Sequence, residues 1–138
     1  MKLFKTLLTI LVISLLSSPS WSVDIGELMK REGIYYQKFS DVPYTGKITG
    51  GTQGSIKNGK REGAWVFYYE SGQLEAKGNF KNGEREGAWV DYHQNGQLWG
   101  RHNYKNGNRY GAQVSYNEDG TLNKLNTGTF KNGEKISD

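Results

Sequence analysis

The sequence predicts an all-β fold, in which consecutive antiparallel β-hairpins form one elongated, twisted meander sheet. The segment that begins at Lys57 recurs at Lys81 with 14 identities in 24 positions, and a fixed period in this range indicates a repeat architecture. Turn-forming pairs such as Asn58-Gly59, Ser71-Gly72 and Asn82-Gly83 recur every 11 to 13 residues, as expected for tight hairpin turns whose two central residues have positive φ. The stretches between them are rich in the aromatic and β-branched residues that favour strands. None has the three- and four-residue apolar spacing of a helix.

The first 22 residues have the pattern of a signal peptide. Lys2 and Lys5 give a positively charged start, residues 7–16 form a run of apolar and hydroxyl residues, and Ser22 places a small residue before the expected cleavage point. The apolar run has about half of the ~20 residues that span a bilayer, which favours a cleaved signal over a membrane anchor. We therefore expect an exported protein, periplasmic or secreted, that begins at Val23 and has no transmembrane span.

Charge and cysteine content narrow the classes of partner. The formal net charge of the whole chain is +4. Cleavage would remove two lysines and no acid and leave +2, so the basic character overstates the attraction of the processed protein for anions. We expect no nucleic acid partner. The chain contains no cysteine, which excludes disulfides, thiolate metal sites and cysteine nucleophiles.

Residues 23–43 are expected to form an irregular cap before the repeats, which span 44–138. Two short apolar runs, Leu28–Lys30 and Ile34–Tyr36, predict a hairpin within this cap. The alternative is a single helical turn over Ile25–Lys30, which Gly26 disfavours. Terminal repeats of such arrays are usually atypical, which is consistent with a cap.

Equivalent positions of successive repeats form columns, which in a meander become ladders of cross-strand contacts. Side chains alternate between the faces of a strand, so Trp65 lies on one face and Val66 and Tyr68 on the other, and both faces carry apolar surface. We expect the recurring glycines to adopt backbone conformations closed to other residues or to lie against an aromatic ring. The residues expected to hold the repeats together are Gly59, Gly63, Trp65, Tyr68, Gly72, Leu74, Gly83, Gly87, Trp89, Tyr92, Gly96, Leu98, Gly107, Gly111, Tyr116, Gly120, Leu122 and Gly133.

The spacing Gly78-x-Phe80-x-x-Gly83-x-x-x-Gly87 resembles the core of a MORN repeat. The added Tyr-x-x-x-Gly-x-Leu spacing of each repeat resembles the bacterial MORN-variant repeat, and the resemblance covers about residues 44–133. It implies a hairpin-repeat fold. Proteins of this family are often described as antitoxins of toxin–antitoxin systems, so the resemblance also implies an antitoxin-type role.

Four features depart from that pattern. His102 stands where Gly54 and Gly78 stand in the other repeats, and Gln113 stands where the tryptophans stand. Two extra residues precede Gly128. The fourth feature is the signal peptide, because an antitoxin that acts on a cytoplasmic toxin should not be exported.

No catalytic or metal-binding constellation is expected. His93 and His102 have Asp91 as the one nearby carboxylate, without a third ligand or an orienting partner, so both are expected as surface or half-buried side chains. The loop Gly54–Arg61 nearly matches a phosphate-binding loop, but it lacks the final hydroxyl residue and a following helix. We therefore expect neither an enzyme nor a cofactor.

Two surface features remain as candidate binding sites. The first is a row of lysines, one at each Lys-Asn-Gly turn on the same end of the meander, with arginines 61, 85 and 109 nearby; interspersed acids and a simple solubility role weigh against it. Its members are Lys57, Lys81, Lys105 and Lys131. The second is Trp99, which has no aromatic counterpart in the other repeats, where Glu75 and Asn123 stand.

The function predicted from these features is a non-enzymatic, exported repeat module for protein–protein interaction or scaffolding, with another protein as its partner. One alternative is binding to an anionic membrane or lipopolysaccharide surface through the lysine row. A second is glycan binding by an aromatic face, and a third is an antitoxin or immunity role against an exported toxin.

Overall fold

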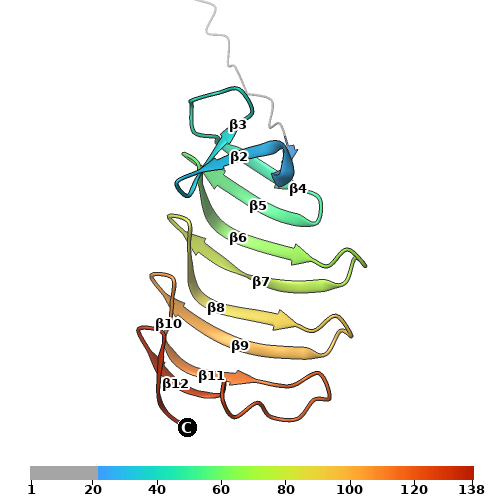
Figure 1. The fold of residues 1–138 in the computed structure, drawn as a ribbon, viewed down its shortest axis with the longest axis vertical. Coiled ribbons are helices and arrows are strands. Elements are labelled where there is room, and N and C mark those ends of the chain that lie inside the picture. The colour runs from blue at the N-terminus through green and yellow to red at the C-terminus, as the bar shows by residue number, and fades with distance from the viewer. Residues whose placement is uncertain (1–21) are drawn as a thin grey trace, which may run out of the picture.

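The computed structural model describes residues 22–138, which form an 11-stranded sheet and a separate two-stranded sheet. Consecutive strands of the large sheet lie side by side as hairpins stacked along one axis (Figure 1). The sheet is twisted and does not close on itself, so the predicted fold class is confirmed. The expected signal peptide lies outside the described residues except for Ser22, the first residue of β1.

The large sheet begins with a parallel pair, β1 with β4, and continues in chain order through antiparallel pairs to β13, while β10 pairs with β9. The elements are β1 (Ser22–Asp24), the 3-10 helix η1 (Ile25–Glu27), β2 (Leu28–Arg31), β3 (Ile34–Gln37), β4 (Gly46–Thr49), β5 (Thr52–Lys57), β6 (Lys60–Tyr68), β7 (Leu74–Lys81), β8 (Glu84–Tyr92), β9 (Leu98–Lys105), β10 (Asn108–Arg109), β11 (Gly111–Ser115), β12 (Gly128–Lys131) and β13 (Glu134–Ser137).

The hairpin expected in the N-terminal cap is present as β2 and β3. Its two-residue turn is Glu32-Gly33, with φ of 49° and 81°, which is the backbone conformation that tight hairpins require. The alternative helical turn is also present in part, as η1. It is only three residues long and ends where the hairpin begins.

The two edges of the array use different turns. At the Lys-Asn-Gly edge both turn residues have positive φ, as in Asn58 (49°) and Gly59 (76°). At the opposite edge only the glycine does, as in Gly72 (84°), and its N–H donates to the carbonyl of Tyr69 at 2.8 Å. The expectation of two positive-φ residues is therefore wrong at this second edge, because the turn is wider and needs one left-handed residue after it.

The recurring glycines divide into two groups with different physical roles. Gly63 and Gly87 have φ of 71° and 68°, and no atom lies within 4 Å of the position a Cβ would take, so backbone conformation alone requires glycine there. A Cβ at Gly54 or Gly78 would instead overlap the indole ring of the tryptophan opposite. The two reasons we expected for a recurring glycine are both present, at different positions.

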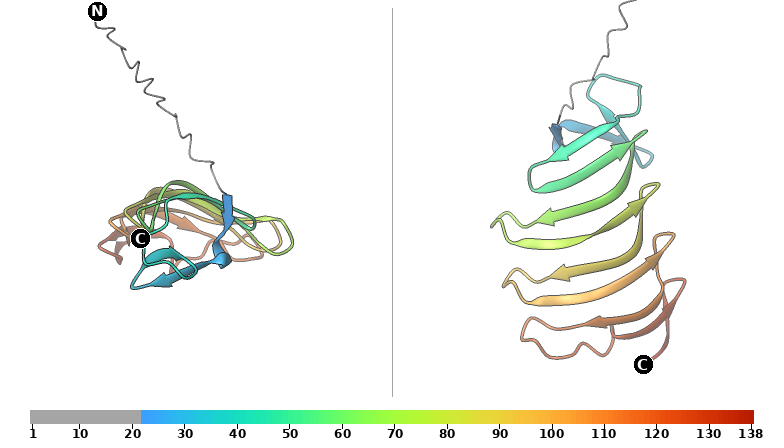
Figure 2. Two further views of the ribbon diagram at one scale, coloured as in Figure 1. Left: turned by 90° about the horizontal axis from the view of Figure 1, so that it is seen from above. Right: turned by 180° about the vertical axis from the view of Figure 1, so that it is seen from behind.

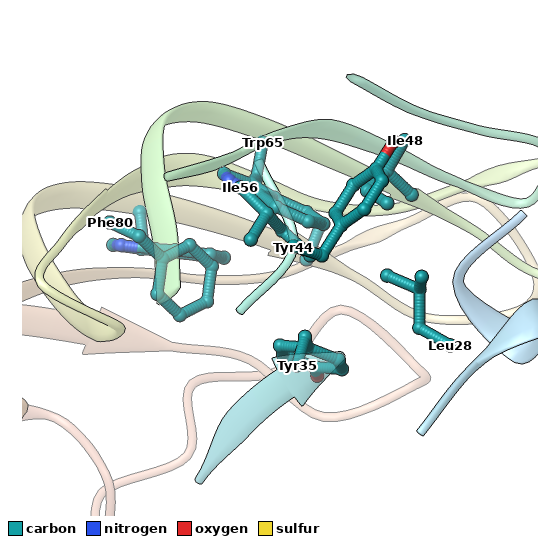
Figure 3. Close-up of a cluster of buried hydrophobic side chains, with 9 residues drawn as sticks. Leu28, Tyr35, Tyr44, Ile48, Ile56, Trp65 and Phe80 are labelled. Carbon is teal, nitrogen blue, oxygen red and sulfur yellow. The ribbon is translucent and has the colours of Figure 1, made fainter. Parts of the chain in front are cut away.

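The core lies on the concave side of the curved sheet. Trp65 and Trp89 are 1% and 0% exposed, and the ring of Phe80 packs edge-on between them at centroid distances of 5.8 and 5.1 Å. The hairpin β2–β3 lies beneath the arch (Figure 2, left) and adds Leu28 and Tyr35 to the cluster (Figure 3). The hairpin therefore contributes buried apolar side chains to one end of the core.

Candidate functional site

The core changes from apolar to polar across strands β8, β9 and β11, which we call the third repeat. The carboxylate oxygen Oδ2 of Asp91 lies 2.8 Å from Nδ1 of His102, and Nε2 of the same ring lies 2.9 Å from Oγ of Ser115. Because an ionised carboxylate can only accept, the Nδ1–H of His102 donates to Asp91. The guanidinium of Arg85 lies 3.8 Å from the other carboxylate oxygen, and Ser115 also lies 3.2 Å from the carbonyl oxygen of Asn126.

An Asp–His–Ser chain of hydrogen bonds has the order found in serine hydrolases, but this one is enclosed. Asp91, His102 and Ser115 are 3%, 1% and 0% exposed. A nucleophilic hydroxyl must reach a substrate carbonyl, and the buried Oγ of Ser115 cannot do so in this structure. The three side chains therefore form a polar part of the core, which we call the polar cluster.

The polar cluster takes the place of the glycine–tryptophan contact of the preceding repeat. In the preceding repeat the ring of Trp89 covers Gly78, and its indole N–H donates to the carbonyl of Asn79 at 3.1 Å. In the third repeat His102 supplies a ring at the glycine position. The shorter Gln113 makes the equivalent hydrogen bond, from its amide to the carbonyl of Asn103 at 2.9 Å. The two departures from the repeat pattern therefore compensate one another.

Sequence reasoning missed this cluster, and its expectation for His102 is wrong. His102 is buried, whereas His93 is half-buried as expected. The reason is tertiary: Asp91 and Ser115 occupy equivalent positions of successive repeats and face the core beside His102. A usable signal was present, because the glycine and the tryptophan of the repeat are lost together in the third repeat.

Trp99 lies at the end of the polar cluster and is half-buried. Its ring meets that of His102 edge-on at 5.4 Å and that of His93 at 6.4 Å. His93 is itself held, because its Nε2–H donates to the carbonyl of Tyr116 at 2.9 Å. The indole is thus supported on two sides by fixed imidazole rings while part of its surface stays accessible.

The predicted lysine row lies on the edge formed by the Lys-Asn-Gly turns, and all four lysines are exposed. Two acids near this row accept structural hydrogen bonds from the backbone. Oε2 of Glu62 accepts from the N–H of Asn82, and Oε2 of Glu86 accepts from that of Asn106, each at 2.9 Å. These bonds tie each turn to the preceding repeat, so the carboxylates remain beside the lysines.

The nearby arginines do not join that row. The guanidinium of Arg61 lies 4.8 Å from the centre of the Trp65 ring, and that of Arg85 lies 4.0 Å from the centre of Trp89. Arg109 lies 5.5 Å from the ring of Phe130. All three therefore cover core aromatics through cation–π contacts.

The described residues offer little to a small ligand. A shallow pocket of about 570 Å³ lies between neighbouring turns and is lined by Tyr69, Glu70, Ser71, Gln73 and Gln94. Burial, followed by the nearby carboxylates of Glu75, Asp91 and Glu118, raises the pKa of the Tyr69 hydroxyl, which donates to the carbonyl of Tyr92 at 2.7 Å. Within residues 22–138 no three His, Asp or Glu side chains are grouped to hold a metal ion.

The fold defines a class of protein, an open array of hairpin repeats. Two consecutive stretches, residues 61–82 and 85–106, match the family model for the MORN repeat variant, which supports a MORN-repeat protein. The curated proteins and the solved structures gave no match to this chain. No helix in the described part of the chain has the length and apolarity to cross a bilayer. MORN repeats commonly serve as modules that interact with proteins or membranes.

Proposed function

We propose that this chain is an exported, non-enzymatic repeat module that binds a protein partner through the region around Trp99. The observation behind this proposal is that the rings of His93 and His102 pack against the indole of Trp99 and hold it in place. Binding energy at protein interfaces is concentrated in a few aromatic or arginine anchors. An anchor that is already held in place loses little conformational entropy on binding.

Site-specific cross-linking tests this proposal. A photoreactive phenylalanine analogue at position 99 should cross-link one partner protein in cells that produce the chain, and the same analogue at Lys77, on the other face, should not. With that partner purified, Trp99→Ala should weaken binding by about 2 kcal/mol or more. Lys81→Gln should change it by less than about 0.5 kcal/mol. Equal cross-linking from both positions would contradict the proposal.

Export is a separate part of the proposal and has its own test. Cleavage before Val23 would leave only Val23 and Asp24 of β1, and Val23 pairs with Ile48 of β4. Protein from the cell envelope should have the mass of residues 23–138. Protein that retains Met1 and remains in the cytoplasm would contradict this part.

A second candidate is attachment to an anionic surface, favoured by the exposure of all four lysines on one edge. A basic residue near an anionic membrane contributes about 1 kcal/mol, and salt screens this attraction over roughly 8 Å at physiological ionic strength. Changing all four lysines to glutamine, or raising the salt, would then remove binding to vesicles that contain phosphatidylglycerol. The acids held beside the row favour the protein partner, for which binding would depend little on salt.

A further inference from the structure

The face of the sheet opposite the core carries a repeated pattern of its own. Side chains alternate along a strand, and Trp65 and Phe67 of β6 belong to the core. Val66 and Tyr68 therefore face the other way, and the same alternation holds in β8 and β11. The residues of this pattern, which we call the outer ladder, are Val66, Tyr68, Val90, Tyr92, Val114 and Tyr116, all half-buried.

Leucines accompany the tyrosines of the outer ladder. The register pairs Tyr68 with Leu74 and Tyr92 with Leu98, and Tyr116 forms a bridge with Leu122. Within residues 22–138 the three tyrosine hydroxyls make no hydrogen bond to the protein, whereas the Tyr69 hydroxyl does. Each repeat thus presents a tyrosine ring beside a leucine, with a free hydroxyl.

Two cations lie in the same face. Lys77 pairs with Val66 on one side and Val90 on the other, and Arg101 pairs with Val90 and Val114. Both side chains are exposed, and neither forms an ion pair or a hydrogen bond with the described residues. This face of the sheet therefore combines the aromatic rings of the outer ladder with the unpaired positive charges of Lys77 and Arg101.

The spacing of this pattern follows from the repeat. Each repeat contributes two strands, and neighbouring strands are ~4.7–4.9 Å apart, so equivalent side chains recur about every 10 Å. Strands β5 to β9 are stacked in regular order (Figure 1), which extends the ladder along the array. In an extended β-1,4-linked glycan successive sugars are turned over, so the same face recurs every second ring. The spacing of these rings is comparable to that of equivalent side chains in the outer ladder.

We propose that the outer ladder binds an extended β-1,4-linked glycan that carries carboxylate groups. The apolar C–H faces of alternate sugar rings pack on the tyrosine rings, and the free tyrosine hydroxyls bond to sugar hydroxyls. The carboxylates pair with Lys77 and Arg101 through charge-assisted hydrogen bonds. This site lies on the face opposite the core and is independent of the proposed protein interface at Trp99.

Glucose polymers that differ in charge or in linkage test the proposal. The purified protein should bind carboxymethyl cellulose about tenfold or more tightly than unmodified cellulose, which lacks the carboxylates, and than carboxymethyl starch, whose α-1,4 linkage changes the spacing. Lys77→Gln with Arg101→Gln should lower binding to carboxymethyl cellulose about tenfold. The matched pair Lys81→Gln with Lys105→Gln removes the same charge from the turn edge and should leave binding unchanged.

A second set of variants tests the aromatic part. Replacing all three ladder tyrosines by threonine should abolish binding to both celluloses, while Tyr92→Phe, which keeps the ring, should retain it, and thermal melting identifies variants that remain folded. Trp99→Ala should leave glycan binding unchanged, which separates this site from the protein interface. Three results would overturn the proposal: an equal loss of glycan binding in the two double lysine or arginine variants, no preference among the polymers, or binding to phosphatidylglycerol vesicles but not to the glycans.

Discussion

The polar cluster makes a quantitative prediction about stability. In His102→Gly the imidazole is lost, and the carboxylate of Asp91, 3% exposed, keeps only the guanidinium of Arg85 at 3.8 Å. Removing a hydrogen-bond partner from a buried carboxylate costs about 3–5 kcal/mol, because the carboxylate stays buried with less compensation. We therefore expect His102→Gly to lower the free energy of unfolding by about 3–5 kcal/mol.

The preceding repeat shows how this loss can be reversed. There a tryptophan covers a glycine, and Phe67 stands where Asp91 stands in the third repeat. Gln113→Trp alone should clash with the ring of His102 and cost about 1–3 kcal/mol. The triple change Asp91→Phe, His102→Gly and Gln113→Trp recreates the aromatic arrangement. Replacing buried ion pairs by packed apolar groups is often neutral or stabilising, so the triple variant should have a stability close to that of the unchanged protein.

Urea unfolding followed by tryptophan fluorescence and by circular dichroism measures these differences. The decisive quantity is the coupling free energy between the substitutions. A triple variant as unstable as the sum of its single changes would refute the view that the polar cluster replaces an aromatic one. So would a His102→Gly variant that loses less than about 1 kcal/mol.

Other predictions concern single positions. Gly87→Val should lower the free energy of unfolding by about 1–3 kcal/mol, because φ there is 68°; Gly87→Asn, which tolerates that conformation, should cost less, and equal effects would contradict the backbone explanation. Gly78→Ala should cost about 1–3 kcal/mol in urea unfolding, because its Cβ would overlap the ring of Trp89. Lys81→Ala should change stability by less than about 0.5 kcal/mol. The hydroxyl and then the N–H of Thr121 donate to Asp119 and lower the pKa of its carboxyl. Its contribution to stability should therefore be present above the pKa of the unfolded chain and lost as pH falls through the lower folded pKa. Carbon-13 NMR titration of the Asp119 carboxyl checks the direction of its pKa shift. In the Asp119→Asn control this part of the pH dependence of stability should be absent.

The sequence by itself determined the repeat period, the hairpins of the repeats and the positions of their glycine-containing turns from Asn58-Gly59 onward. Local chemistry is sufficient for this, since Asn-Gly pairs such as Asn82-Gly83 have few conformations that suit a tight turn, and the 24-residue period in the sequence repeats the same hairpin. It also indicated that the tryptophans and the Val–Tyr pairs lie on opposite faces, because alternation within a strand is a local property. The expected lysine row on one edge follows from the same antiparallel order.

Only the tertiary structure decided what the side chains do once the strands are paired. The curvature of the sheet puts one face in a closed core, so Arg61 and Arg85 cover tryptophan rings instead of extending the lysine row. The register across β8, β9 and β11 brings Asp91, His102 and Ser115 within hydrogen-bonding distance. Such contacts depend on which strand is the neighbour and on how far it is shifted, and a one-residue shift would turn every side chain to the other face.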